Sequence, residues 1–143
     1  MITFTNTVNI DRPIDEVFAY LAALEHTPEW NWAITETKKV TPGPASVGTR
    51  YRQTRRVPQV STEELEIIAL DPDRRIEIRA TLADLPAHLV YELDQVSTGT
   101  SVTNTVEIEP QGVFRLIGPV VGGRAKNAVA ENLSKLKELL EAG

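Results

Sequence analysis

The chain has 143 residues, of which 41% are hydrophobic and 24% are charged, values that are ordinary for a folded globular chain. Its formal net charge of −5 argues against a nucleic-acid partner or an anionic membrane surface. No run of about 18 apolar residues is present, so we expect no membrane span. The length suits one domain, which we expect to cover residues 1–143.

Composition also removes several kinds of chemistry. There is no cysteine, which excludes disulfides, thiolate nucleophiles and cysteine-ligated metal. The two histidines, His26 and His88, do not occur in an HExxH-type spacing, so we expect neither a metal site nor a cofactor. Residues 1–6 lack a basic stretch followed by an apolar segment, so we expect no signal peptide and a cytoplasmic location.

The N-terminal part predicts a strand followed by helices. Residues 2–10 alternate apolar and polar side chains, the pattern of a strand with one buried face. Asp11 is a candidate helix cap and Pro13 suits the first turn of the helix that follows. The helix presents one apolar stripe, formed by Ile14, Val17, Phe18, Leu21 and Leu24. Residues 26–28 interrupt it, and residues 29–32 can form only a short second helix.

The middle of the chain predicts six further strands separated by turn residues. The candidate strands are Ile34–Val40, Thr49–Val57, Glu63–Leu70, Arg75–Leu82, His88–Gln95 and Ser101–Glu109. The connections contain proline, glycine or aspartate, and one of them is the expected turn at residues 84–86. Such short connections favour antiparallel neighbours, because a parallel crossover needs a dozen or more residues.

Matching the faces of neighbouring strands predicts two registers. For the third and fourth strands, it gives the facing pairs Tyr51–Ile67, Gln53–Leu65, Arg52–Glu66 and Arg55–Glu63. For the sixth and seventh strands, it gives Leu93–Val102, Tyr91–Asn104 and Leu89–Val106. The basic run at residues 50–56 is thereby neutralised by glutamates and is interpreted as a charged sheet surface.

A long helix is predicted at the C-terminus, from Pro119 to Glu141, with a length of about 34 Å at 1.5 Å per residue. One buried stripe is expected along it, formed by Ala125, Val129, Leu133, Leu136 and Leu140. Gly118, Gly122 and Gly123 follow no phosphate-loop pattern. They either let the helix approach the sheet closely or loosen a lid.

The order strand, helix, short helix, six strands and long helix resembles the polyketide cyclase/dehydrase and lipid-transport group of the SRPBCC (START-like, birch-pollen-allergen-like) superfamily. The matching segments are residues 10–18, 28–30, 48–51, 99–103 and 133–141. The resemblance implies an α+β helix-grip fold, in which a seven-stranded antiparallel curved sheet wraps around the long C-terminal helix. Two short helices then lie between strands 1 and 2, and an internal cavity lies between sheet and helix.

The resemblance and the strand alternation together predict which residues line that cavity. The expected ligand-binding residues are Trp30, Tyr51, Gln53, Leu65, Ile67, Ile78, Tyr91, Asn104, Phe114, Val121, Ala125 and Val129. Tyr91 and Asn104 either offer polar groups to a ligand or simply satisfy one another. Arg55 with Glu63 either binds a ligand carboxylate at the mouth or forms an ordinary rim ion pair.

Binding of a small apolar or aromatic molecule, lipid-like or polyketide-like, is the function that this pattern favours. One alternative is a cyclase or dehydratase that uses Tyr51, Tyr91 or His26 as acid–base groups, although no catalytic residue is fixed by spacing. If His26 has no catalytic role, we interpret it as a histidine that lies at the end of a helix. A second alternative is an interaction or regulatory module with a collapsed cavity and an apolar outer patch, for example around Val90. A monomer and a homodimer are both compatible with the sequence.

Overall fold

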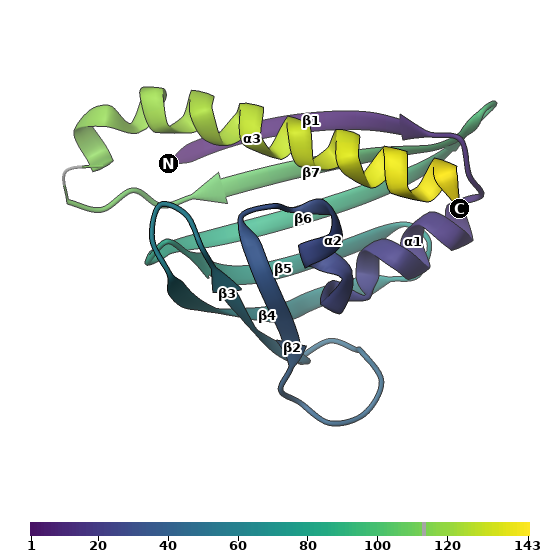
Figure 1. The fold of residues 1–143 in the computed structure, drawn as a ribbon, viewed down its shortest axis with the longest axis horizontal. Coiled ribbons are helices and arrows are strands. Elements are labelled where there is room, and N and C mark those ends of the chain that lie inside the picture. The colour runs from purple at the N-terminus through teal and green to yellow at the C-terminus, as the bar shows by residue number, and fades with distance from the viewer. Residues whose placement is uncertain (113) are drawn as a thin grey trace.

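The computed structural model describes the backbone of residues 1–112 and 114–143 and the side chains of residues 1–112 and 122–143. Within these residues, seven strands form one antiparallel sheet in the order β1-β7-β6-β5-β4-β3-β2 (Figure 1). The strands are β1 (Ile2–Ile10), β2 (Ile34–Lys39), β3 (Arg50–Arg55), β4 (Ser61–Asp71), β5 (Arg75–Leu82), β6 (Leu85–Val96) and β7 (Gly99–Ile108). The predicted strands and their antiparallel pairing are therefore confirmed.

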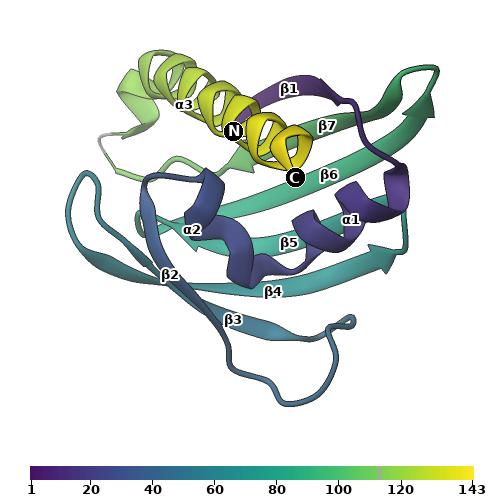
Figure 2. The ribbon, with the colours of Figure 1, turned by 45° about the vertical axis from the view of Figure 1, so that its right-hand side comes forward.

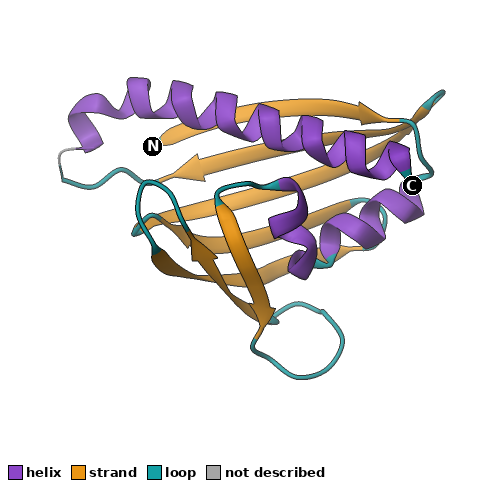
Figure 3. Cartoon of the chain, in the orientation of Figure 1, coloured by secondary structure: helices purple, strands orange, loops and turns teal. Residues whose placement is uncertain are grey.

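The helices all lie on one face of the curved sheet, as Figures 2 and 3 show. They are α1 (Ile14–Ala22), a 3₁₀ turn (Leu24–His26), α2 (Thr27–Trp30) and α3 (Phe114–Ala142). The sheet curves around α3, which confirms the helix-grip fold. With 29 residues, α3 is about 43 Å long, and it begins five residues before the predicted start at Pro119. A proline removes one N–H donor but does not by itself determine where a helix begins.

The start of α1 differs from the prediction. Pro13 occupies the cap position without a side-chain hydrogen bond, so Asp11 is not the cap. Instead, the backbone N–H of Asp11 donates to Glu141 Oε2 at 2.8 Å, and Arg12 Nη2 donates to the Glu141 carbonyl at 2.8 Å. The segment between β1 and α1 is therefore bound to the C-terminal end of α3, a tertiary contact that local sequence does not encode.

The apolar stripe of α3 packs on the sheet as predicted. Leu133 and Leu136 are 1% and 0% exposed, and both belong to the core cluster that includes Val17 and Leu21 of α1. Near the other end of α3, a Cβ on Gly122 would lie 2.9 Å from Ile2 Cγ2 of β1. The absence of a side chain at this glycine therefore lets the helix approach the sheet closely, which is the first of the two roles considered for it.

One of the two predicted registers is confirmed and the other is wrong by two residues. The observed pairs Tyr91–Asn104, Leu89–Val106 and Leu93–Val102 are those expected for β6 and β7. In β3 and β4, however, the pairs are Tyr51–Leu65, Gln53–Glu63, Arg52–Glu64 and Arg50–Glu66. A shift of two residues keeps every side chain on its face, so alternation cannot detect it. The observed register instead places Gln53 opposite a glutamate that is buried and hydrogen-bonded.

The turn between β5 and β6 also lies earlier than expected. It consists of Ala83 and Asp84, with φ values of 50° and 68°, and Leu82 faces Leu85 directly. Two successive residues with positive φ are typical of the two-residue hairpin turns that match the twist of a sheet. The strand β6 therefore begins at Leu85, and Pro86 belongs to it.

Candidate functional site

A cavity of about 410 Å³ lies between the inner face of the sheet, α2 and α3. Most of the side chains that line it are apolar. Eight of the twelve residues proposed from the sequence are among them: Trp30, Gln53, Leu65, Ile78, Tyr91, Asn104, Ala125 and Val129. The side chains of Phe114 and Val121 lie outside the described residues. A cavity of this size falls within the range of pockets that enclose small organic ligands.

The remaining two residues, Tyr51 and Ile67, belong to the solid core beside the cavity. They are 1% and 0% exposed, and they share a packed cluster with Leu24 and the buried stripe of α1. Burial, with a smaller effect from the charge of Glu25, raises the pKa of Tyr51. Both side chains belong to the expected face of the sheet, but they are buried in this packed cluster and do not line the cavity.

Exposed residues mark the mouth of the cavity and buried residues mark its interior. Trp32 is 52% exposed, and Pro58 and Ala83 are also exposed, yet all three line the cavity. The interior is bounded by side chains such as Asn104, which is 0% exposed, and Val106. The guanidinium of Arg56 lies 5.5 Å from the centre of the Trp32 ring and so supports the mouth from outside.

A buried carboxylate organises the polar part of the wall near the mouth. The side chain of Glu63 is only 1% exposed. Its Oε1 accepts a hydrogen bond from Gln53 Nε2 at 2.7 Å, and its Oε2 accepts from Arg55 Nε at 2.7 Å and from the backbone N–H of Ala83 at 2.6 Å. Both carboxylate oxygens are therefore occupied by protein donors. The Arg55–Glu63 pair therefore differs from the ordinary rim ion pair considered from the sequence, because the Glu63 side chain is almost fully buried.

Two polar side chains, Asn104 and Tyr91, line the interior, and one of their polar atoms is buried without a partner. Asn104 Nδ2 donates to the Val90 carbonyl at 3.2 Å, whereas its Oδ1 is buried without a hydrogen bond. The ring of Tyr91 meets that of Trp30 edge-on, with 6.5 Å between centroids. Burial raises the pKa of Tyr91, so its hydroxyl stays protonated. The interpretation that Tyr91 and Asn104 satisfy one another is therefore wrong, because the amide bonds to the backbone instead.

His26 lies in a separate cluster outside the cavity wall. Its ring stacks on Tyr20 with 4.3 Å between centroids, and its Nδ1 lies 2.8 Å from Glu29 Oε2. The Tyr20 hydroxyl donates to the other oxygen of the same carboxylate at 2.8 Å. These hydrogen bonds lower the pKa of Glu29, while burial and the adjacent carboxylate raise the pKa of Tyr20 to about 12. The structure thus places His26 at a helix end, held by its neighbours.

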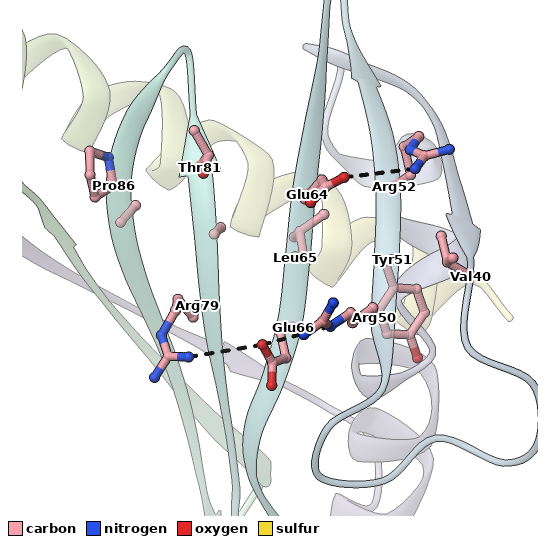
Figure 4. A pocket seen from close by; sticks show the side chains of 12 residues that line it. Val40, Arg50, Tyr51, Arg52, Glu64, Leu65, Glu66, Arg79, Thr81 and Pro86 are labelled. Carbon is pink, nitrogen blue, oxygen red and sulfur yellow. Dashed lines mark ion pairs between the residues drawn. The ribbon is translucent and has the colours of Figure 1, made fainter.

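A second hollow, of about 450 Å³, lies over β3, β4 and β5 and carries charged side chains from the outer face of the sheet (Figure 4). Its charges are paired with one another: Arg52 lies 3.7 Å from Glu64, while Arg50 and Arg79 lie 4.0 and 3.9 Å from Glu66. This arrangement agrees with the interpretation of the basic run as a charged sheet surface. Tyr51 is also among the residues around this hollow, and its hydroxyl, like Asn104 Oδ1, is buried without a hydrogen-bond partner.

Sequence reasoning missed several residues of the cavity wall. Asn132 of α3 is 7% exposed and lines the cavity. Asn132 lies seven residues after Ala125 and three after Val129, a spacing that places the three on the same helix face. This spacing could have identified Asn132 as a residue of the cavity wall. Glu63 was missed as an organiser of the wall because the register prediction placed it opposite Arg55, two residues away from its true partner Gln53.

Among the described residues, no group of three or more His, Cys, Asp or Glu side chains gathers as a metal site requires. In the same part of the chain, no helix is both long enough and apolar enough to cross a membrane. Val90, proposed as the centre of an outer apolar patch, is only 7% exposed.

Comparison with solved structures supports the fold. The protein MLL2253 from Mesorhizobium loti superposes with a TM-score of 0.75 at 19% identity, over 98% of this chain and 97% of that chain. The Polyketide_cyc-like protein Cgl2372 from Corynebacterium glutamicum gives 0.63 at 23% identity, over 98% and 91%. The di-domain ARO/CYC StfQ from the steffimycin biosynthetic pathway gives 0.74 at 12% identity, over 96% of this chain and 50% of that chain. A search of curated proteins found no match.

The structural similarities above support only the fold, whereas a family model assigns the chain to a family. The model described as polyketide cyclase / dehydrase and lipid transport matches residues 1–141. It confirms the resemblance found in the sequence and agrees with the observed helix-grip fold. The chain therefore belongs to the polyketide cyclase/dehydrase and lipid-transport family.

Proposed function

We propose that the protein binds a small apolar or aromatic molecule in the cavity between the sheet and α3. The observation that carries the proposal is the combination of an apolar wall around about 410 Å³ with the unpartnered Oδ1 of Asn104. A buried acceptor without a partner is costly, and an external donor that enters the cavity would remove that cost. Apolar walls would supply affinity at about 25 cal/mol per Å² of surface buried.

Binding is better supported than acid–base catalysis. Of the three groups considered as acid–base residues, His26 and Tyr51 do not line the cavity, and Tyr91 is held in its protonated form by burial. A tyrosine that stays protonated cannot act as a general base, and of the described residues only Arg55 adds a second titratable side chain to the cavity wall. The cavity itself argues against the alternative of a collapsed interior.

Native mass spectrometry of freshly purified protein tests the proposal directly, because a retained molecule adds its own mass. A thermal-shift screen with aromatic and aliphatic compounds then supplies hits for titration. Ala125 lines the cavity from α3, so Ala125→Phe should fill part of it and weaken the binding of a hit. Arg52→Ala, in the outer hollow, is the matched control and should leave the affinity unchanged. A hit that responds to Arg52→Ala and not to Ala125→Phe would place the ligand on the outer face and refute the proposal.

A further inference from the structure

The charges around the cavity limit which ligand it can accept. Of the described residues that line it, Arg55 alone carries a formal charge. That charge is already matched, because the Arg55 Nε donates to Glu63 Oε2 at 2.7 Å and the Glu63 side chain is 1% exposed. Together the two side chains are neutral. The polar part of the wall, as far as the described side chains form it, therefore has no surplus positive charge with which to hold an anion.

A ligand carboxylate placed on the outer nitrogens of Arg55 would meet a second difficulty. The guanidinium would then join two carboxylates, one from the ligand and one from Glu63, and like charges close together repel. An ion that enters an apolar cavity also loses its hydration, and this loss is recovered only where a countercharge is free to pair with it. Arg55 cannot serve as that countercharge, because it is already paired with Glu63.

Arg56 does not change this balance. Its guanidinium also lies near the mouth, but Arg56 is exposed and does not line the cavity. Its charge lies over the outer Trp32, at 5.5 Å from the ring centre, and its Nε donates to the Trp32 carbonyl. Water screens such an exposed charge far more than it screens a charge in the interior.

The interior end of the cavity requires a different kind of ligand group. Asn104 is 0% exposed and lines the cavity, and its Nδ2 already donates to the Val90 carbonyl. The remaining Oδ1 can only accept a hydrogen bond. A hydroxyl on the ligand satisfies it, whereas an ether, a hydrocarbon or an ionised carboxylate has no proton to offer.

We propose that the cavity selects a neutral, hydroxyl-bearing apolar molecule and discriminates against the carboxylate of the same carbon skeleton. This inference rests on the proposed ligand-binding function and narrows its ligand class. Two features of the wall carry it: the neutral Arg55–Glu63 pair near the mouth and the unpartnered Asn104 Oδ1 in the interior.

Matched probes test the selectivity on the wild-type protein. Isothermal titration at neutral pH would compare 2-naphthol, 2-methoxynaphthalene and 2-naphthoate, and in parallel 1-dodecanol, its methyl ether and dodecanoate. In a series that binds, we expect the alcohol to bind at least about tenfold more tightly than the ether or the carboxylate. If the carboxylates bind as tightly as the alcohols, the inference is overturned while ligand binding stands. If none of the six compounds binds, the proposed function fails and the inference fails with it.

Two substitutions assign the selectivity to its residues. Asn104→Leu should reduce the preference for the alcohol over the ether to about twofold or less, because the acceptor is gone. Glu63→Gln should leave Arg55 without a countercharge and so strengthen binding of the carboxylate by about tenfold or more, with little effect on the alcohol. A merely structural role of Glu63 would weaken all ligands together, which would overturn the charge argument.

Glu63→Gln is compatible with the fold, and a near neighbour supplies its control. The glutamine oxygen can keep the bonds from Arg55 and Ala83, and the Gln53 amide can turn over so that its carbonyl accepts from the new NH₂ group. Glu64→Gln removes the same charge from an exposed side chain on the opposite face of the sheet and should change neither selectivity. Circular dichroism checks that each variant is folded. The order of affinities of the probes for the wild-type protein tests the inference without any variant.

Discussion

Glu63 accepts a hydrogen bond from Arg55 at 2.7 Å although the two residues do not face each other in the sheet. Arg55 faces Ser61, and Glu63 faces Gln53, so the ion pair is diagonal across β3 and β4. Diagonal neighbours on one face of an antiparallel pair lie within reach of long side chains. The same carboxylate also accepts from the N–H of Ala83 in the turn between β5 and β6, so one side chain joins β3, β4 and this turn beside the cavity mouth.

The Glu63 network predicts a large loss of stability on truncation. Glu63→Ala leaves Arg55, Gln53 and the Ala83 N–H without their acceptor, and breaking a buried ion pair typically costs about 3–5 kcal/mol. Denaturant unfolding should therefore show a markedly lower free energy of unfolding. Glu64→Ala is the control, since its side chain is 76% exposed and its contact with Arg52 is 3.7 Å long. Similar effects of the two substitutions would contradict the structural role of the network.

The stripe of α3 predicts a second difference in stability. Leu136 is 0% exposed, and Leu→Ala in a core usually costs about 2–5 kcal/mol. Lys135→Ala should change the Tm little, because this side chain is 53% exposed and its nearest carboxylate oxygen lies 3.9 Å away. Lys137 would be a poor control, since its Nζ donates to the Asn9 carbonyl at 2.7 Å. An unchanged Tm for Leu136→Ala would show that the stripe is misplaced.

Two adjacent glycines of α3 should respond differently to alanine. A Cβ on Gly123 would meet nothing within 4 Å, so Gly123→Ala should stabilise the protein by about 0.5–1 kcal/mol through helix propensity alone. A Cβ on Gly122 would lie 2.9 Å from Ile2 Cγ2, so Gly122→Ala should gain less or lose stability. Thermal unfolding of both variants checks this order, and a greater gain at Gly122 would be inconsistent with the close approach of α3 to β1.

The Tyr20 cluster predicts a pH effect with a defined sign. The pKa of Tyr20 is raised from 10.0 to about 12, so the folded protein holds the phenol proton more tightly than the unfolded chain does. This contribution to stability is fully present below pH 10 and is lost as the pH rises from 10 to about 12. Tyr20→Phe has no such proton. The difference in unfolding free energy between wild type and this variant should therefore shrink across that window, and a constant difference would refute the prediction.

Much of the fold could be predicted because alternation and helical spacing report which face of an element is buried. The pairing of Tyr91 with Asn104 followed from matching apolar and polar positions along β6 and β7, and the spacing of Leu133 and Leu136 identified the buried stripe of α3. These patterns arise locally, since a strand repeats every two residues and a helix every 3.6. The structure reproduced them without change.

The depth and surroundings of each side chain were decided by the tertiary structure. Alternation places Tyr51 and Gln53 on one face, yet Tyr51 is buried in the core cluster that includes residues of α1 and the 3₁₀ turn, while Gln53 lines the cavity. The register of β3 and β4 differs from the prediction by two residues, which changes no face but gives Glu63 its partners. The physical reason is that facing direction is a local property of the backbone, whereas burial and charge pairing depend on which distant segments cover that face.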